Sequence, residues 1–183
     1  MGMDVYGEDP KLVSRRPTID FATATEEEKS RYFDEVDQFE VDNPGYYFRN
    51  NVWWWRPLWM YVAEVANNVL TAKDIESGHA NSGHLISKTK AERIARILKR
   101  ELENGNVQKH ATEYMQMLKN LPLVECTHCD GTGIRNDEHV QGTCNACGGT
   151  GKVKNFNCNY PFHPENVEDF QRFCQYSGGF RIC

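Results

Sequence analysis

Four of the seven cysteines in this chain stand in two pairs with the spacing Cys-x-x-Cys. The pairs are Cys126 with Cys129 and Cys144 with Cys147. Two residues between the cysteines let one tight turn direct both sulfur atoms at the same metal ion, and two such turns supply the four thiolates of a tetrahedral zinc site. Because the protein would provide all four ligands, no coordination position stays open for a substrate. The spacing therefore predicts one structural zinc ion and no catalytic metal.

Each pair opens a longer repeat, C-x-x-C-x-G-x-G, which runs over residues 126–133 and again over residues 144–151. The glycines permit a positive φ and let backbone N–H groups approach the thiolates, which spreads the negative charge of the sulfur atoms. We expect the residues between the two pairs to form a small hairpin. Disulfide pairing is disfavoured because the cysteine count is odd and the opening residues, MGMDVYGEDP, lack the features of a signal peptide. Iron–sulfur or redox use of the pairs is a weaker alternative, since the glycine pattern matches structural zinc.

These repeats resemble the cysteine-rich region of the DnaJ chaperone family, and the resemblance covers about residues 126–153. DnaJ has four repeats and two zinc ions, so the two repeats of this chain imply one zinc ion. The sequence shows no J domain, and the tripeptide His163-Pro164-Glu165 is similar to the HPD motif of that domain without a helical hairpin around it. The resemblance therefore implies the zinc module alone and no co-chaperone function.

All four tryptophans lie within the segment WWWRPLW, which begins at Trp53. Successive residues cannot all face a core, so we expect two of the indoles inside the protein. A third indole remains a candidate for contact with a nucleobase or a partner protein. The loop GHANSGH over residues 78–84 would add polar groups to such a site, although a surface loop without a ligand is the favoured interpretation. The candidate ligand-binding residues are Trp53, Trp54, Trp55, Arg56, Asn51 and His84.

The segment that follows Ser87 carries a run of lysines and arginines at helical spacing, as a nucleic-acid-binding stripe would. We favour the solvated face of an amphipathic helix, because Glu92, Glu101 and Glu103 partly balance the charge. The net charge of −5 further disfavours nucleic acid and anionic membranes as partners. No Ser–His–Asp order, phosphate-binding loop or pair of carboxylates stands out, so no catalytic residue is predicted.

Apolar residues at helical spacing predict five helices, at about residues 26–41, 57–71, 88–103, 110–121 and 167–176. Residues 46–51 are expected to be extended and residues 76–86 to form a loop, and the first two dozen residues to be irregular with one short strand at most. The predicted fold class is therefore mainly α with minor β, a helical domain with an inserted single-zinc, two-knuckle hairpin module. In this division residues 1–122 form the N-terminal part of the helical domain and residues 123–155 form the zinc module. Residues 156–183 form a C-terminal helix that packs back on the helical domain.

Hydrophobic residues make up 39% and charged residues 26% of the 183 positions, which is typical of a folded domain. The most apolar stretch, residues 52–63, is too short for a membrane helix, and unpaired thiols suit a reducing cytoplasm. The segments FRNNVWWWRPLW and GHANSGHLIS, the paired repeats and the closing SGGFRIC together resemble a family of small proteins of bacteriophages and bacterial genomes. That resemblance implies an accessory protein in the cytoplasm of a host cell, but it supplies no activity for individual residues.

Three hypotheses about function follow from these patterns. The first is a zinc-stabilised binding protein that acts through protein–protein interaction on a host or phage protein. The second is a protein that binds or sequesters a nucleotide through the Trp53–Trp59 segment. The third, a nucleic-acid binder, would use the basic helix and the zinc knuckles.

Overall fold

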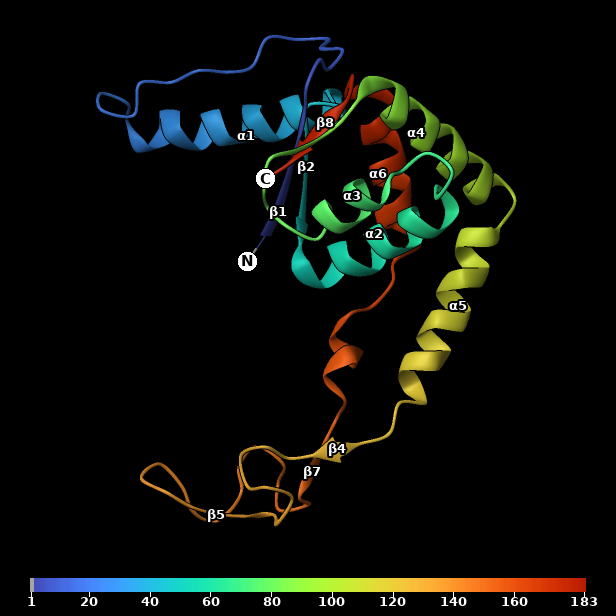
Figure 1. Cartoon of the computed structure of the whole chain (residues 1–183). Helices are drawn as coiled ribbons and strands as arrows, with labels where there is room; N and C mark the ends of the chain where they lie inside the picture. The colour runs from blue at the N-terminus through green and yellow to red at the C-terminus, as the bar shows by residue number, and fades with distance from the viewer. Residues whose placement is uncertain (1) are drawn as a thin grey trace. The chain divides into compact units, whose positions relative to one another are not determined.

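The computed structural model describes residues 2–183, in which the chain forms two compact units (Figure 1). The first unit comprises Met1–Ala111 and Phe162–Cys183, and the second comprises Thr112–Pro161. The second unit is thus an insertion in the sequence of the first. The domain limits given above, 1–122, 123–155 and 156–183, stay a prediction.

The first unit contains a four-stranded antiparallel sheet with the strand order β2-β1-β8-β3. Side chains alternate between the two faces of the sheet, and Met3 and Val5 of β1 and Phe180 and Ile182 of β8 are all buried. This alternation gives the sheet one apolar face, which must be covered by other elements. The strands are β1 (Gly2–Gly7), β2 (Tyr47–Asn51), β3 (His84–Ile86) and β8 (Phe180–Ile182).

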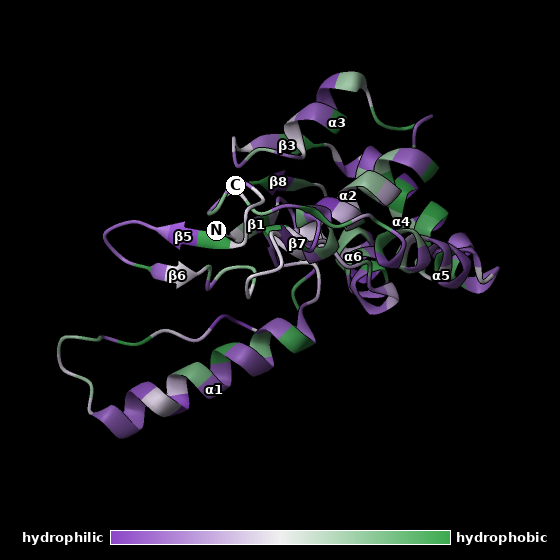
Figure 2. Cartoon of the chain, turned by 90° about the horizontal axis from the view of Figure 1, so that it is seen from below, coloured by the Kyte–Doolittle hydropathy of each residue, from purple (hydrophilic) through white to green (hydrophobic). Residues whose placement is uncertain are grey.

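Three helices of the first unit, α2, α4 and α6, pack against one another and lie on one side of the sheet, whereas α1 extends away from it (Figure 1). In Figure 2 the helices α2, α4 and α6 again lie together, and α1 shows many hydrophilic positions along its length. The helices of this unit are α1 (Glu26–Asp42), α2 (Val52–Val65), α3 (Ala72–Ser77), α4 (Lys88–Glu103) and α6 (Pro164–Tyr176).

Two tryptophans, one turn apart on α2, lie at the centre of this core. Trp55 and Trp59 are fully buried, their rings stack 5.5 Å apart, and Phe170 of α6 meets Trp55 edge-on. The indole N–H of Trp55 donates to the carbonyl of Gly78 (2.6 Å), and that of Trp59 donates to the carbonyl of Ile75 (2.9 Å). A Cβ at Gly78 would lie 2.0 Å from the Trp59 ring, so only glycine fits there. The prediction of two tryptophans in the core is confirmed.

The prediction of a mainly α fold class is wrong. Helices make up 46% of the chain and strands 15%, and the strands include the four-stranded antiparallel sheet, so the fold class is α+β. The missed strands are too short to show alternation, since β3 and β8 have only three residues each. β8 also follows directly after Ser177-Gly178-Gly179, which marked the end of the last predicted helix. Residues 76–86, predicted as a loop, contain the end of α3 and all of β3.

Side chains at the N-termini fix where two of the helices begin. The Thr25 hydroxyl accepts from the N–H of Glu28 (3.3 Å), and the Glu28 carboxylate accepts from the N–H of Thr25 (2.8 Å), so the predicted start of α1 is confirmed. Helix α2 begins directly after Asn51, whose side chain accepts from the N–H of Trp54 (3.0 Å). Pro57 therefore lies inside α2 and not at its start, and the predicted boundary was wrong.

A buried carboxylate ties α3, β3 and α4 together. Asp74 of α3 is 3% exposed and accepts hydrogen bonds from the backbone and hydroxyl of Thr71 (both 2.7 Å). Its other partners are Nε2 of His84 on β3 (2.9 Å) and the ammonium group of Lys90 on α4. Burial acts to raise the pKa of Asp74, but the hydrogen bonds from Lys90, His84 and Thr71 outweigh it and hold this pKa well below its usual range. The ionised carboxylate is therefore the form that the fold stabilises.

Replacing Asp74 with Asn is expected to lower the free energy of unfolding at pH 7 by about 1–3 kcal/mol, because Lys90 and His84 lose a charged acceptor. In the unchanged protein this contribution is present above the ordinary carboxyl pKa of about 4 and is lost as the pH falls toward the lowered folded-state pKa, because the unfolded chain takes up the proton first. Urea unfolding followed by tryptophan fluorescence from pH 7 to pH 3 measures both effects. The difference in the free energy of unfolding between the two proteins should become smaller at low pH. A difference that stays constant would contradict the stabilising role of the ionised Asp74 carboxylate.

Candidate metal centre

The Thr112–Pro161 unit places the two Cys-x-x-Cys turns between two short pairs of antiparallel strands. β4 pairs with β7 where the chain enters and leaves the module, and β5 pairs with β6 in the segment between the cysteine pairs. The predicted hairpin between the pairs is thus confirmed. Helix α5 crosses into the unit at its start, and the 3-10 helix η1 lies near its end. The bounds are α5 (Asn106–Lys119), β4 (Val124–Glu125), β5 (Ile134–Asn136), β6 (Gln141–Thr143), β7 (Lys152–Val153) and η1 (Phe156–Asn159).

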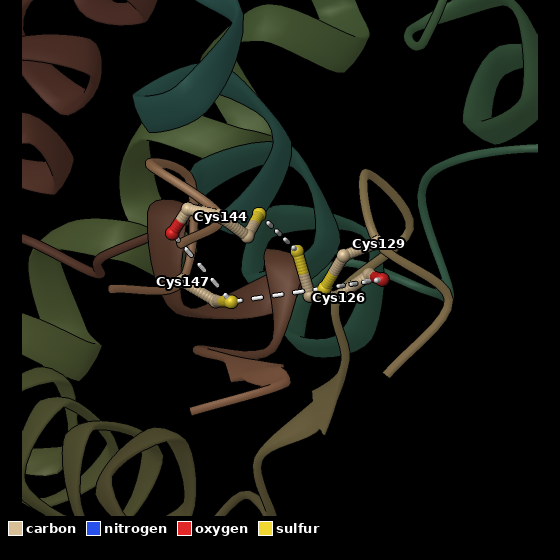
Figure 3. A group of neighbouring side chains, drawn as sticks. All are labelled: Cys126, Cys129, Cys144 and Cys147. Carbon is tan, nitrogen blue, oxygen red and sulfur yellow. Dashed lines mark hydrogen bonds between the residues drawn. The ribbon is translucent and has the colours of Figure 1, made fainter. Parts of the chain in front are cut away.

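The four cysteine sulfur atoms converge on one point, as Figure 3 shows. All four lie within 4.8 Å of one another, with 3.9 Å between Cys126 and Cys144 and 3.8 Å between Cys129 and Cys147. A tetrahedral ion with metal–sulfur bonds of about 2.3 Å requires sulfur–sulfur distances of about 3.8 Å. These distances far exceed the roughly 2 Å of a disulfide bond, and all four thiols are free. The cysteines are therefore arranged as a metal ion would need them.

Each cysteine turn is closed by the same set of hydrogen bonds. In the first turn the N–H of Gly131 donates to the carbonyl of Cys126 (3.1 Å). The hydroxyl of Thr132 donates to the carbonyl of Cys129 (2.7 Å) and accepts from the N–H of Ile134 (3.3 Å). The second turn repeats these bonds with Gly149, Cys144, Thr150, Cys147 and Lys152.

The two threonines belong to the site although the sequence analysis assigned them no role. A signal for them was present, because threonine occupies the same position between the glycines in both repeats. A hydroxyl at this position bridges the second cysteine of the turn to the strand that follows, so Thr132 and Thr150 hold the direction in which the chain leaves the turn.

The backbones of the two turns lie against each other. The N–H of Cys126 donates to the carbonyl of Gly151 (2.9 Å), and the N–H of Cys144 donates to the carbonyl of Gly133 (2.9 Å). Gly133 and Gly151 both have positive φ, at +76° and +70°. A Cβ at either position would lie 2.2 Å or 2.1 Å from a carbonyl oxygen of the opposite turn. The last glycine of each repeat is therefore required by this close approach as well as by its conformation.

Burial and backbone N–H groups have opposite effects on the pKa values of the thiols. Burial raises the pKa of Cys129 to about 11, although the N–H of Gly133, 3.3 Å from the sulfur, opposes the increase. At Cys147 burial also acts upward, but hydrogen bonds from the N–H of Gly151, the side chain of Cys144, the N–H of Gly149 and the side chain of Cys129 outweigh it and lower the pKa to about 7. All four thiols must lose their protons to bind a metal ion, so these N–H groups favour the metal-binding form.

The three candidate tryptophans at the start of α2 differ in exposure. Trp55 is fully buried, whereas Trp53 is 37% and Trp54 is 43% exposed. The ring of Trp54 lies 4.7 Å from the ring of His163, which precedes α6. The start of α2 thus has one face buried in the core and another face exposed to solvent.

The polar candidates near this segment are engaged in the fold. The side chain of Asn51 caps α2, and His84 pairs with the buried Asp74. Arg56 is exposed, and its charge acts with burial to lower the pKa of His79. Two of the polar candidates thus already have partners within the fold, and the ligand-binding role of this segment stays a prediction.

No protein-family model, no curated protein and no solved structure matches this chain. In the part of the chain from residue 2 onward, no helix has both the length and the apolar character needed to cross a membrane. What the structure establishes is a compact, largely buried cluster of four cysteines that is compatible with a metal ion.

Replacing Gly151 with Ala is expected to weaken metal affinity by about 10- to 100-fold, because the new Cβ would collide with a carbonyl oxygen of the opposite turn. Gly148→Ala is the matched control. Gly148 also has positive φ (+60°), but nothing lies within 4 Å of its Cβ position, so this change costs only the left-handed backbone, about 1–2 kcal/mol. Competition with a chromophoric zinc chelator measures both affinities. Equal losses of metal affinity in the two variants would contradict a role for the close approach between the two turns.

Proposed function

We propose that this chain is a small binding protein whose Thr112–Pro161 unit is held together by one structural zinc ion. The observation that carries this proposal is the convergence of four cysteine sulfur atoms at tetrahedral spacing. Because the protein would supply all four ligands, the ion has no open position for a substrate or an attacking water. The expected role of the ion is therefore to shape a surface.

Several properties of the site favour zinc among the metals that thiolates bind. A tetrahedral set of four sulfur ligands is typical of zinc and of iron centres, and zinc undergoes no redox change that would alter the geometry. The N–H of Gly133 points at the sulfur of Cys129 and offsets part of the thiolate charge. The likeness of the repeats to the DnaJ cysteine-rich region supports the same ion.

A protein is the partner that the surface of this unit favours. Leu123 and Phe156 are 59% and 60% exposed, which is a high degree of exposure for large apolar side chains. Exposed apolar side chains on a rigid frame are characteristic of surfaces that bind other proteins. The net charge of −5 disfavours nucleic acid as the partner.

The alternative functions receive less support. A nucleotide site on the Trp53–Trp59 segment would need Asn51 and His84, whose side chains already have partners within the fold. On the basic helix α4, Lys90 pairs with Asp74 and Lys99 lies 3.8 Å from Glu103, which reduces the charge available to a phosphate backbone. We further propose, from the resemblance to small phage and bacterial proteins, an accessory role in a reducing cytoplasm, where these thiols stay free to bind metal.

Purified protein is expected to contain one zinc ion per chain by elemental analysis. The double change Cys126→Ser and Cys144→Ser should abolish the bound zinc, because each turn loses one ligand, whereas Cys183→Ser, outside the cluster and in the first unit, should retain it. Chelation should open residues 124–153 to protease and leave tryptophan emission unchanged, since every tryptophan lies in the first unit. A metal-free wild-type protein, or zinc retained by the double variant, would rule out the proposed centre.

The binding role is tested by comparing the same two variants as bait in an extract of host cells. We expect a protein that is recovered by the wild type and by Cys183→Ser but is lost with Cys126→Ser/Cys144→Ser, because the metal-free unit no longer presents its surface. Equal recovery by all three baits, or no protein above background, would contradict binding through the zinc unit.

A further inference from the structure

The Thr112–Pro161 unit contains a groove of about 350 Å³ that is separate from the cysteine cluster. One wall is the last turn of α5 and the segment that leads to β4, and the other is the segment between β7 and η1. The thiol of Cys158 lies 3.5 Å from the carbonyl of Leu118 and joins the two walls. The residues that define the groove are Met115, Leu118, Leu121, Leu123, Lys119 and Lys154.

The interior of the groove is apolar. Leu118 is buried, Leu121 is half-buried and Leu123 is 59% exposed, so apolar side chains run from the floor of the groove to its rim. Immediate sequence neighbours of the lining continue this character, since Val124 is 38% and Phe156 is 60% exposed. Apolar surface left in contact with water is unfavourable by about 25 cal/mol per Å², and a partner that covers it recovers this free energy.

The charged groups that line the groove all have the same sign. Lys119 stands at the end of α5 and Lys154 follows β7, and no carboxylate is among the lining residues. Neither ammonium group forms an ion pair with any of residues 2–183. The groove therefore carries positive charge in a chain whose net charge is −5. A ligand with carboxylates beside an apolar side chain would complement both features.

We propose that this groove binds an acidic, apolar segment of the partner protein. A leucine or phenylalanine side chain of that segment enters between Leu118, Leu121 and Leu123, and its neighbouring carboxylates meet Lys119 and Lys154. The inference rests on the proposed function as a binding protein and names the chemistry of its partner. Nucleic acid is less suitable, because two lysines neutralise few phosphates and the groove between them is apolar.

Three fluorescein-labelled peptides of twelve residues test the proposal by fluorescence anisotropy with full-length, zinc-loaded protein. The first repeats Asp-Leu-Glu-Phe, the second has Lys in place of every acidic residue, and the third has Ser in place of every Leu and Phe. We expect the first peptide to bind at least about tenfold more tightly than either of the others, since it alone matches both the charge and the apolar floor. Raising the salt concentration should weaken the binding of the first peptide, because dissolved ions screen its attraction to the lysines.

Matched variants locate the binding site. Leu123→Asp and Lys154→Glu should each weaken binding of the first peptide by about tenfold or more, because one removes the apolar contact and the other reverses the charge. Ile134→Asp is the control, since Ile134 has the same 59% exposure but lies on the β5–β6 hairpin. It should leave the affinity unchanged. Zinc content is measured for every variant, so that a loss of binding with one ion per chain reports on the groove and not on folding.

The outcomes separate this inference from the proposal on which it rests. If zinc is present and the first peptide does not bind, or binds equally to all variants, the groove is not the docking site while the zinc-stabilised unit stands. Tighter binding of the lysine peptide, or of a single-stranded RNA oligonucleotide, would overturn the acidic partner. Self-association in sedimentation that Leu123→Asp abolishes would show that a second copy of the chain fills the groove instead.

Discussion

Around the two cysteine turns, the buried cluster consists of Cys126, Cys129 and Cys144, with Cys147 and Val153 packed against it. Without a large aliphatic or aromatic side chain in this cluster, hydrophobic burial contributes little free energy to the turns. Four deprotonated thiols would also repel one another at these distances. A divalent cation would remove this repulsion and add cohesion, so that binding of a metal ion would be coupled to folding of the turns. The hairpin β5–β6 and the pair β4–β7 adjoin these turns and would depend on that closure.

The first unit is stabilised in a different way. Its core stacks Trp55 on Trp59 beside Phe170, which in turn contacts Phe173 and Phe180, so apolar burial provides the driving force. The two indole N–H groups and the Asp74 carboxylate have hydrogen-bond partners in this core, whereas the buried hydroxyl of Tyr61 has none among residues 2–183. The chain thus combines a unit held together by a hydrophobic core with one built around four clustered cysteines, and under the proposed function removal of the ion would act on the second unit.

The sequence predicted features that depend on spacing or on one local contact. The Cys-x-x-Cys pairs identify the four clustered cysteines because their geometry is local, and the Thr25–Glu28 capping box marks the start of α1 for the same reason. The sheet was missed because pairing of β1 with β8 joins the two ends of the chain, and three-residue strands carry no periodic signal. The partnership of His84 with Asp74 likewise depends on how α3 and β3 meet, which no local pattern specifies.

The inserted unit is continuous in sequence, whereas the unit around it requires both Met1–Ala111 and Phe162–Cys183. A ribosome therefore adds the whole of Thr112–Pro161 before it adds α6 and β8. Until these two elements are available, β1 lacks its neighbour β8, and the aromatic side chains of α2 lack Phe170. The cysteine turns, in contrast, need no residue outside Thr112–Pro161 to come together. During synthesis the hydrophobic core of the first unit is therefore completed only when the residues that follow the inserted unit can join it.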